Sequence, residues 1–242
     1  MASQEHCLVC FEALDAELNK RKPLSLEEVQ SSWIAFKSSS GSSSSAAQQL
    51  LLLVLLNNLP RGGLHPRDVH LLPPHGPFFR PLFVTWNTVA GDDAILRGCI
   101  GTFEAQPLSE GLPEYAVISA LQDTRFPPVS RQELPTLQAA VTLLTDFEEV
   151  DDPYDWEVGT HGIRLSFSHR GRRYGSTYLP DVASEQGWTR EETLFSLVRK
   201  AGWMGSRSHW KDLELKVTRY QGKKVSLDYP EFKRWKDWSG KQ

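Results

Sequence analysis

Two short segments with alternating apolar and polar residues are separated by only three residues, and this spacing is the strongest constraint on the fold. The segments are Ile163–Ser168 and Arg172–Tyr178, and His169-Arg170-Gly171 lies between them. A connection this short joins neighbouring antiparallel strands, because parallel strands need a crossover of about a dozen residues or more. We therefore expect a β-hairpin here and antiparallel sheet in the fold.

Other stretches predict further strands and several helices. Strands are expected at 82–86, 94–103 and 137–144, and at two segments, 213–217 and 225–229, joined by a turn at Gln221-Gly222. Helices are expected at 8–18, 26–36, 50–56, 115–122 and 190–201; Ser25 with Glu28 and Thr189 with Glu192 have the spacing of capping boxes. Because helices are interspersed with strands that short turns join, the favoured class is α+β, with a largely antiparallel sheet flanked by helices.

Composition excludes several classes of protein. The chain has 27 basic and 30 acidic residues and a net charge of −3, so we expect no nucleic-acid partner. Its 3 cysteines do not suggest a secreted disulfide framework, and the first residues lack the pattern of a signal peptide. The longest apolar run, Leu50–Leu56, is too short to span a bilayer. We expect a cytoplasmic protein without a membrane segment, with the nucleus left open.

The serine run at 38–45 and the prolines that follow predict an irregular segment. We interpret 38–80 as a variable Ser/Pro/Gly-rich insertion, either a loop or an ordered lid, within a single domain that covers 1–242.

The segment Leu96-Arg97-Gly98-Cys99-Ile100-Gly101 concentrates chemically active residue types. Glycine lets the backbone turn sharply or a ligand approach closely. In a regular strand, the period of two places Arg97 and Cys99 on one face. A thiol beside a guanidinium is a candidate nucleophile. The alternative is a small buried cysteine in a glycine-kinked strand, with Arg97 paired to a structural acid.

This hexapeptide resembles the signature of the AMMECR domain family, which is named for a human chromosomal deletion syndrome. Other segments resemble the family in the same order: Phe83–Trp86, Ala120–Pro128, Trp156–Ile163, Tyr178–Ala183, Gln186–Trp188 and Arg199–Trp203. The resemblance runs from Pro81 to the C-terminus. The N-terminal Cys7-Leu8-Val9-Cys10 resembles eukaryotic members, and 38–80 resembles a fungal-type elaboration.

The resemblance implies a two-part α+β fold with an antiparallel sheet and a cleft. It implies no settled activity, because the family has none. Prokaryotic relatives are found beside, or fused with, Memo-type and radical-SAM proteins, an association that suggests an enzymatic pathway.

We predict three catalytic residues. Cys99 is the candidate nucleophile. His161, between Gly159 and Gly162, is the candidate general base, because an imidazole titrates near neutral pH. Asp123 would orient His161 or accept a proton. The alternatives are a turn histidine that bonds local backbone, and an Asp123–Arg125 ion pair that locks the following turn.

The candidate binding residues are Arg97, Gly98, Gly101, Arg125 and Glu157. Arg97 would hold an anion, and Glu157 would be either a desolvated acid or a surface carboxylate. A zinc site needs four ligands, and the sequence around Cys7 and Cys10 does not offer them. We therefore expect these two cysteines to be buried on a helix face. We therefore predict no metal and no cofactor.

Three functions remain open at this stage. The first is a small-molecule enzyme that uses Cys99 in a cleft lined by the hexapeptide and the Gly-x-His-Gly segment. The second is a non-catalytic protein that binds a small ligand. The third is an adaptor for a protein partner, with 38–80 and the aromatic residues Trp235 and Trp238 as docking elements.

Overall fold

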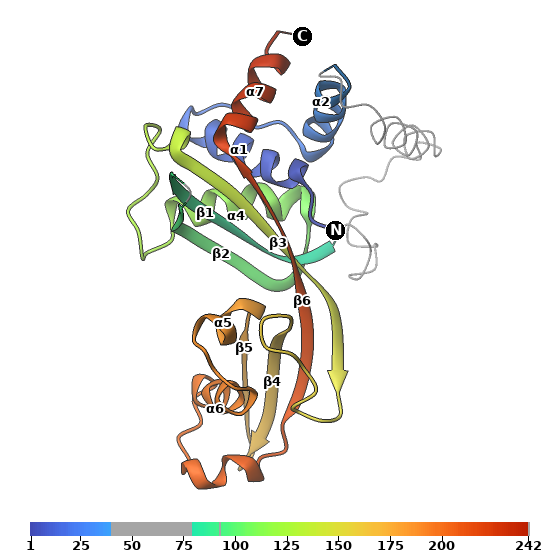
Figure 1. Ribbon diagram of the computed structural model, residues 1–242, viewed down its shortest axis with the longest axis vertical. Coiled ribbons are helices and arrows are strands. Elements are labelled where there is room, and N and C mark those ends of the chain that lie inside the picture. Colours follow the sequence, from blue (N-terminus) through green and yellow to red (C-terminus); the bar gives the residue numbers. More distant parts are fainter. Residues whose placement is uncertain (40–78, 92, 242) are drawn as a thin grey trace, which may run out of the picture. The chain divides into compact units, whose positions relative to one another are not determined.

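The computed structural model describes residues 1–39, 79–91 and 93–241 (Figure 1). Most of the insertion predicted at 38–80, and the helix predicted at 50–56, lie outside these residues. The ends of the predicted insertion belong to regular elements. Ser38 and Ser39 complete α2 (Leu26–Ser39), and Phe79 and Arg80 begin β1 (Phe79–Ala90).

The described residues form helices and an antiparallel sheet of six strands, so the expected α+β class is confirmed. The remaining strands are β2 (Asp93–Pro107), β3 (Leu137–Val150), β4 (Gly162–His169), β5 (Arg172–Tyr178) and β6 (Lys216–Asp228). The remaining helices are α1 (Gln4–Leu18), α4 (Leu108–Leu121), α5 (Pro180–Glu185), α6 (Arg190–Lys200) and α7 (Tyr229–Ser239), with short 3-10 turns η2 (Leu134–Thr136) and η3 (Arg207–Asp212). The strands follow the order β2-β1-β3-β6-β4-β5.

The chain divides into two compact units. The first consists of Met1–Leu143 and Lys224–Gln242, and the second of Leu144–Lys223. Each unit has a hydrophobic cluster of its own. That 1–242 behaves as one domain stays a prediction.

The core of the first unit forms where α1 and α4 cover one face of the sheet (Figure 1). Strand β1 alternates as expected, and its residues Leu82, Val84 and Trp86 are fully buried. The indole N–H of Trp86 donates to the carbonyl of Ala116 in α4 at 2.9 Å. The ring of Phe11 in α1 meets the Trp86 ring edge-on, with centroids 5.1 Å apart. The same helix buries Cys7 and Cys10 completely, as predicted.

The predicted turn at Gln221-Gly222 is wrong, because β6 runs without interruption from Lys216 to Asp228. Gly222 lies within this strand, and its φ is not positive, so it does not form the predicted turn. Tyr220 pairs with Gly162 of β4 immediately before the expected turn. The predicted strand at 213–217 therefore begins later, at Lys216, and the next one ends at Asp228, where α7 begins.

The C-terminal aromatic residues are not both available for docking, which corrects part of the adaptor hypothesis. Trp235 is fully buried in the first unit, and its indole N–H donates to the Ser32 hydroxyl at 3.1 Å. Trp238 is half-buried against the ring of Phe36. Trp235 lies on α7, an amphipathic helix that was not among the predicted elements.

The predicted hairpin forms in the second unit. Strands β4 and β5 pair from Ile163 with Tyr178 to His169 with Arg172. The turn is therefore the pair Arg170-Gly171, whose φ angles of 50° and 77° are both positive, as a tight two-residue hairpin turn requires. The predicted capping box of α6 is confirmed as well, since Thr189 and Glu192 exchange hydrogen bonds.

Candidate functional site

The hexapeptide lies in β2, which is an edge strand of the sheet, and a β-bulge interrupts it. Trp86 of β1 pairs with Gly98, and Asn87 pairs with Leu96. Arg97 is therefore the extra residue of the bulge and has no partner in β1. The bulge breaks the strict alternation of side chains, so the expectation that Arg97 and Cys99 share a face does not follow from the strand.

Close packing explains both glycines of the hexapeptide. A Cβ atom on Gly98 would lie 2.1 Å from the carbonyl oxygen of Ser119 in α4. A Cβ atom on Gly101 would lie 2.3 Å from the carbonyl oxygen of Leu82 and close to the ring of Phe83. Both positions therefore need glycine for the packing of β2 against its neighbours, whether or not a ligand approaches them.

Cys99 lies on the face of the sheet opposite α4. Gly98 and Trp86 face α4, so the next residue along β2 and its cross-strand partner Thr85 point the other way. The Thr85 hydroxyl donates to the Cys99 sulfur, and the two atoms are 3.2 Å apart. Cys99 is partly exposed, whereas Cys7 and Cys10 are buried. Among the three cysteines, only Cys99 is open to solvent.

The outer edge of β2 at Cys99 is held by two residues from the segment after α4. The backbone N–H of Cys99 donates to Oδ2 of Asp123 at 2.9 Å. The guanidinium Nη2 of Arg125 donates to the carbonyl oxygen of Cys99 at 3.0 Å. Within the part of the chain that the structure describes, β2 has no strand on this side, so Asp123 and Arg125 bind these two backbone groups instead.

The Asp123 carboxylate is fully engaged. Arg125 donates to it from Nε at 2.9 Å, from Nη2 at 2.6 Å and from its backbone N–H at 3.2 Å. The hydrogen bonds from the Arg125 side chain, followed by the one from Cys99, hold the pKa of Asp123 well below its usual range against the opposing effect of burial. Asp123 is thus ionised at neutral pH and has no free oxygen.

The Arg97 side chain is largely buried and only partly satisfied. Its Nε donates to Oε1 of Glu133 at 2.9 Å. Its side chain is 12% exposed, and Nη1 is buried without a hydrogen-bond partner among the described residues. A guanidinium donates five N–H bonds and accepts none, so Nη1 can still donate to an acceptor that reaches it.

His161 and Glu157 belong to the second unit. The imidazole Nδ1 of His161 accepts the backbone N–H of Glu157 at 3.0 Å, and the backbone N–H of His161 donates to the backbone carbonyl of Glu157 at 2.9 Å. The neutral ring therefore carries its proton on Nε2. The Glu157 side chain is exposed.

The first unit thus brings together Arg97, Gly98, Cys99, Gly101, Asp123 and Arg125. Sequence reasoning missed two contacts of this group. Glu133 binds Arg97 and also accepts from the backbone N–H of Ser130 at 2.8 Å. The contact of Thr85 with Cys99 could not be predicted, because neither strand alone shows which of its residues pairs with which residue of the other.

Residues 1–39, 79–91 and 93–241 contain no group of three or more His, Cys, Asp or Glu side chains arranged to hold a metal ion. None of the helices within these ranges has the length and apolar character needed to cross a lipid bilayer.

An α+β fold whose edge strand carries this clamped glycine-cysteine hexapeptide defines an AMMECR-type protein. The AMMECR1 family model matches residues 7–225. The chain therefore belongs to the AMMECR1 family, as the hexapeptide and its flanking segments predicted.

Relatives extend from fungi and plants to archaea. The chain is 48% identical over 152 residues to an uncharacterised protein of Schizosaccharomyces pombe, covering 63% of this chain and 77% of that one. It is 46% identical over 155 residues to one of Arabidopsis thaliana, covering 63% and 72% respectively. The crystal structure of an uncharacterised Pyrococcus horikoshii protein matches with a TM-score of 0.51 and 33% identity, over 66% of this chain and 79% of that one. Family membership therefore does not name a reaction.

Proposed function

We propose that the Arg97–Gly101 segment is the reactive part of a small-molecule enzyme, with Cys99 as the nucleophile and Arg97 as the residue that holds an anionic substrate. The observation that carries the proposal is the state of Cys99. The residue is partly exposed and its sulfur accepts from the Thr85 hydroxyl, while its backbone is clamped by Asp123 and Arg125. A nucleophile must be both reachable and held in one position.

Two hydrogen-bond donors can stabilise the negative charges in this proposal, one at the sulfur and one on the substrate. The Thr85 hydroxyl can donate to a sulfur anion, which stabilises it. The unpartnered Nη1 of Arg97 can donate to a carboxylate or phosphate oxygen of the substrate. The cleft that the family resemblance implies would have to bring these donors to one ligand, and it remains a prediction.

Asp123 acts in this proposal as a positioning residue. All its hydrogen bonds go to Arg125 and to the Cys99 backbone, and its low pKa makes it a poor proton acceptor. His161 remains the predicted proton carrier, acting through Nε2 because Nδ1 is occupied. Glu157 remains a predicted binding residue.

A specific observation also favours a second candidate, a non-catalytic ligand-binding protein. The clamp on Cys99 and the packed glycines at 98 and 101 make this part of β2 a rigid backbone platform, which binds a ligand without needing the thiol. Cys99→Ala separates the two functions. An enzyme loses turnover and a binding protein keeps its ligand.

The first experiment is alkylation of the native protein by iodoacetamide, followed by peptide mass spectrometry. Cys7 and Cys10 serve as internal controls, because both are fully buried. We expect Cys99 to be labelled in the native state and the other two only after denaturation. Labelling of Cys99 only after denaturation would refute the enzyme proposal and leave the binding platform.

A further inference from the structure

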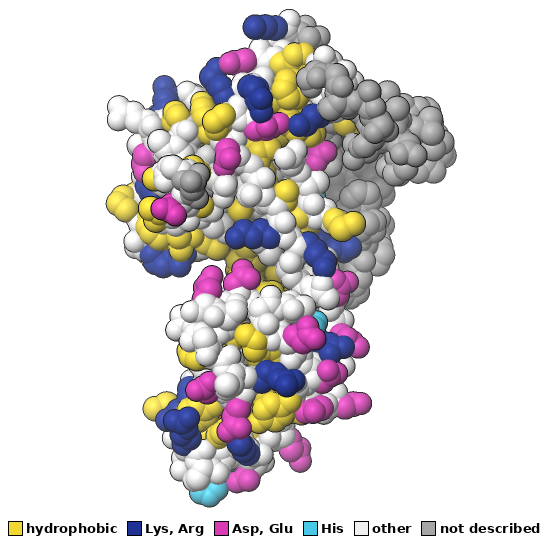
Figure 2. Space-filling view, in the orientation of Figure 1, with side chains coloured by type: hydrophobic (Ala, Val, Ile, Leu, Met, Phe, Trp, Pro, Cys, Tyr) yellow, Lys and Arg dark blue, Asp and Glu magenta, His cyan; other side chains and the backbone are white. Residues whose placement is uncertain are grey.

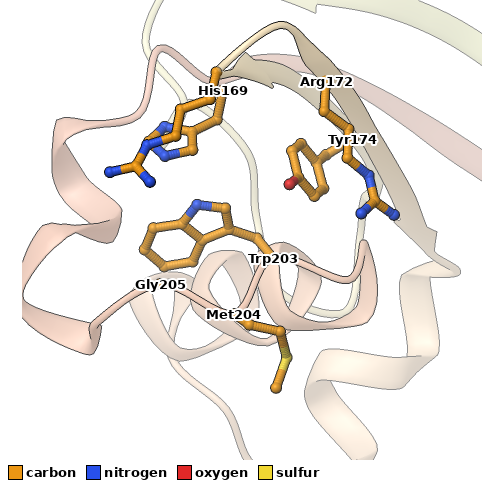
Figure 3. Close-up of a pocket in the computed structure, with 7 residues that line it drawn as sticks. His169, Arg172, Tyr174, Trp203, Met204 and Gly205 are labelled. Carbon is orange, nitrogen blue, oxygen red and sulfur yellow. The ribbon is translucent and has the colours of Figure 1, made fainter.

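A cavity at the tip of the β4–β5 hairpin in the second unit is walled by hydrogen-bond donors (Figure 3). Its volume is about 470 Å³, within the range of small-molecule sites. The residues that line it are His169, Arg170, Arg172, Tyr174, Trp203, Met204 and Gly205. None of them is acidic.

Two of the donors face the interior and have no acceptor. In Figure 3 the Tyr174 hydroxyl and the Trp203 indole nitrogen point toward the space between these two rings and His169. Among the described residues, neither atom makes a hydrogen bond, and neither Arg170 nor Arg172 takes part in an ion pair. An indole N–H and a guanidinium can only donate. The cavity thus offers several donors and positive charge, and no acidic side chain lines it.

The walls of the cavity are held in place without a ligand. The Tyr174 ring stacks on Phe167 with centroids 4.9 Å apart, and the Arg172 guanidinium lies 5.0 Å from the Tyr174 ring centre. Trp203 is only 4% exposed, and a Cβ atom on Gly205 would lie 2.1 Å from its ring. Arg199 donates to the carbonyl of Trp203 at 3.1 Å. Ligand binding to a site that is already formed loses little free energy to ordering the side chains of that site.

Five acidic side chains of the second unit gather elsewhere. Figure 2 shows a group of acidic side chains along the right side of this unit, with others scattered over its visible face. A separate cavity is lined by Glu148, Glu149, Asp151, Asp152 and Asp155. The positive charge of the hairpin cavity is therefore not neutralised by acids in its wall.

We propose that the hairpin cavity binds the phosphate group of a small phosphate ester. A phosphate is negatively charged, accepts several hydrogen bonds and matches the guanidinium fork. The cavity is larger than a phosphate alone, and Met204, which is 83% exposed, offers apolar surface to the organic part of the ester. The inference is independent of the role proposed for Cys99, because it concerns other residues in the other unit.

The test is a titration of the full-length ¹⁵N-labelled protein with ribose 5-phosphate, followed through the indole N–H signal of Trp203. Trp203→Phe identifies this signal by its loss. Inorganic phosphate, uncharged ribose, gluconate, a phosphoserine peptide and a single-stranded oligonucleotide are titrated in parallel. We expect a saturable shift with ribose 5-phosphate, a weaker one with inorganic phosphate and gluconate, and none with ribose.

Three variants examine the donors. Arg170→Asn removes a charge but leaves Asn-Gly, the residue pair that this hairpin turn prefers, so the fold is kept. Tyr174→Phe removes the hydroxyl and keeps the stacked ring. Arg173→Gln is the matched control, because Arg173 is on the same strand but not in the cavity wall. We expect Kd to rise about tenfold for Arg170→Asn, severalfold for Tyr174→Phe and hardly at all for the control.

Three outcomes would overturn the proposal. One is the absence of a saturable shift with any phosphate compound. Another is equal weakening by Arg173→Gln, which would indicate diffuse attraction to surface charge. The third is binding of the phosphopeptide or the oligonucleotide at least tenfold tighter than ribose 5-phosphate, which would assign the cavity to a macromolecule.

Discussion

The Asp123 carboxylate accepts the backbone N–H of Cys99 at 2.9 Å, so the segment after α4 fixes the edge strand that carries the candidate nucleophile. The bond takes the position of a missing neighbouring strand. Arg125 donates to the carbonyl oxygen of Cys99. Both backbone groups of Cys99 are therefore held, while its side chain stays free to react.

We expect Asp123→Asn to destabilise the protein by about 2 kcal/mol, because it weakens a buried hydrogen-bond network and leaves Arg125 without its charge partner. Arg125→Gln should cost at least as much, because it removes the main donors to a carboxylate that is only 4% exposed. Urea unfolding at pH 7 measures both variants. Equal stability of Asp123→Asn and the wild type would show that the clamp is not structural.

Stability should fall in acid partly through Glu12, which is fully buried between Arg21 and Lys236. Burial acts to raise the pKa of Glu12, but hydrogen bonds from Arg21 and Lys236 outweigh it, so the pKa lies below its ordinary value. A lowered pKa contributes stability above the unfolded value of about 4.3, and this contribution disappears as the pH falls through the folded value.

Glu12→Gln tests this effect. We expect it to be about 2–3 kcal/mol less stable than the wild type at pH 7, with the difference shrinking below about pH 4. Denaturant midpoints between pH 7 and pH 3 give the curve. A difference that stays constant over this range would mean that the Glu12 charge contributes nothing.

Gly98→Ala should destabilise the protein by about 3 kcal/mol, because the new methyl group would overlap the Ser119 carbonyl of α4. Gly175→Ala is a matched control in another strand. Its Cβ atom would be 3.6 Å from the nearest neighbour, so its stability should stay within about 1 kcal/mol of the wild type. Thermal unfolding compares the two variants. Similar effects would show that the close approach of α4 to β2 is not what requires glycine.

Thr85→Val should slow alkylation of Cys99 by about threefold, because it removes the hydroxyl that donates to sulfur while keeping the shape of the side chain. Thr85→Ser should restore most of the rate. The measurement is the iodoacetamide reaction at fixed pH, read by mass spectrometry. An unchanged rate in the valine variant would remove Thr85 from the proposed chemistry.

Local signals in the sequence predicted much of this fold. The hairpin around Arg170-Gly171 and the capping box of Thr189 and Glu192 depend on residues a few positions apart, so their spacing was enough. The continuous strand through Gly222 and the burial of Trp235 depend on partners that are remote in sequence, and both were missed.

The candidate site shows the same division. The hexapeptide drew attention to Cys99 and Arg97, but the bulge at Arg97, the contact with Thr85 and the second bond of Glu133 follow from strand register and from the loop after α4. None of these can be read from the spacing of residues. The role of Asp123 is also clearer in three dimensions, because its hydrogen bonds favour positioning over proton transfer.

The most direct test of the central claim compares iodoacetate with iodoacetamide at Cys99, because the two reagents share one reaction and differ in charge. If Arg97 guides anions to this thiol, the ratio of the two rates should be about tenfold higher than for glutathione at low salt. It should fall to the glutathione value in Arg97→Gln. Glu133→Gln removes the negative charge that pairs with Arg97 and should raise the ratio. A wild-type ratio equal to that of glutathione, or one that Arg97→Gln leaves unchanged, would contradict an anion-binding reactive site at Cys99.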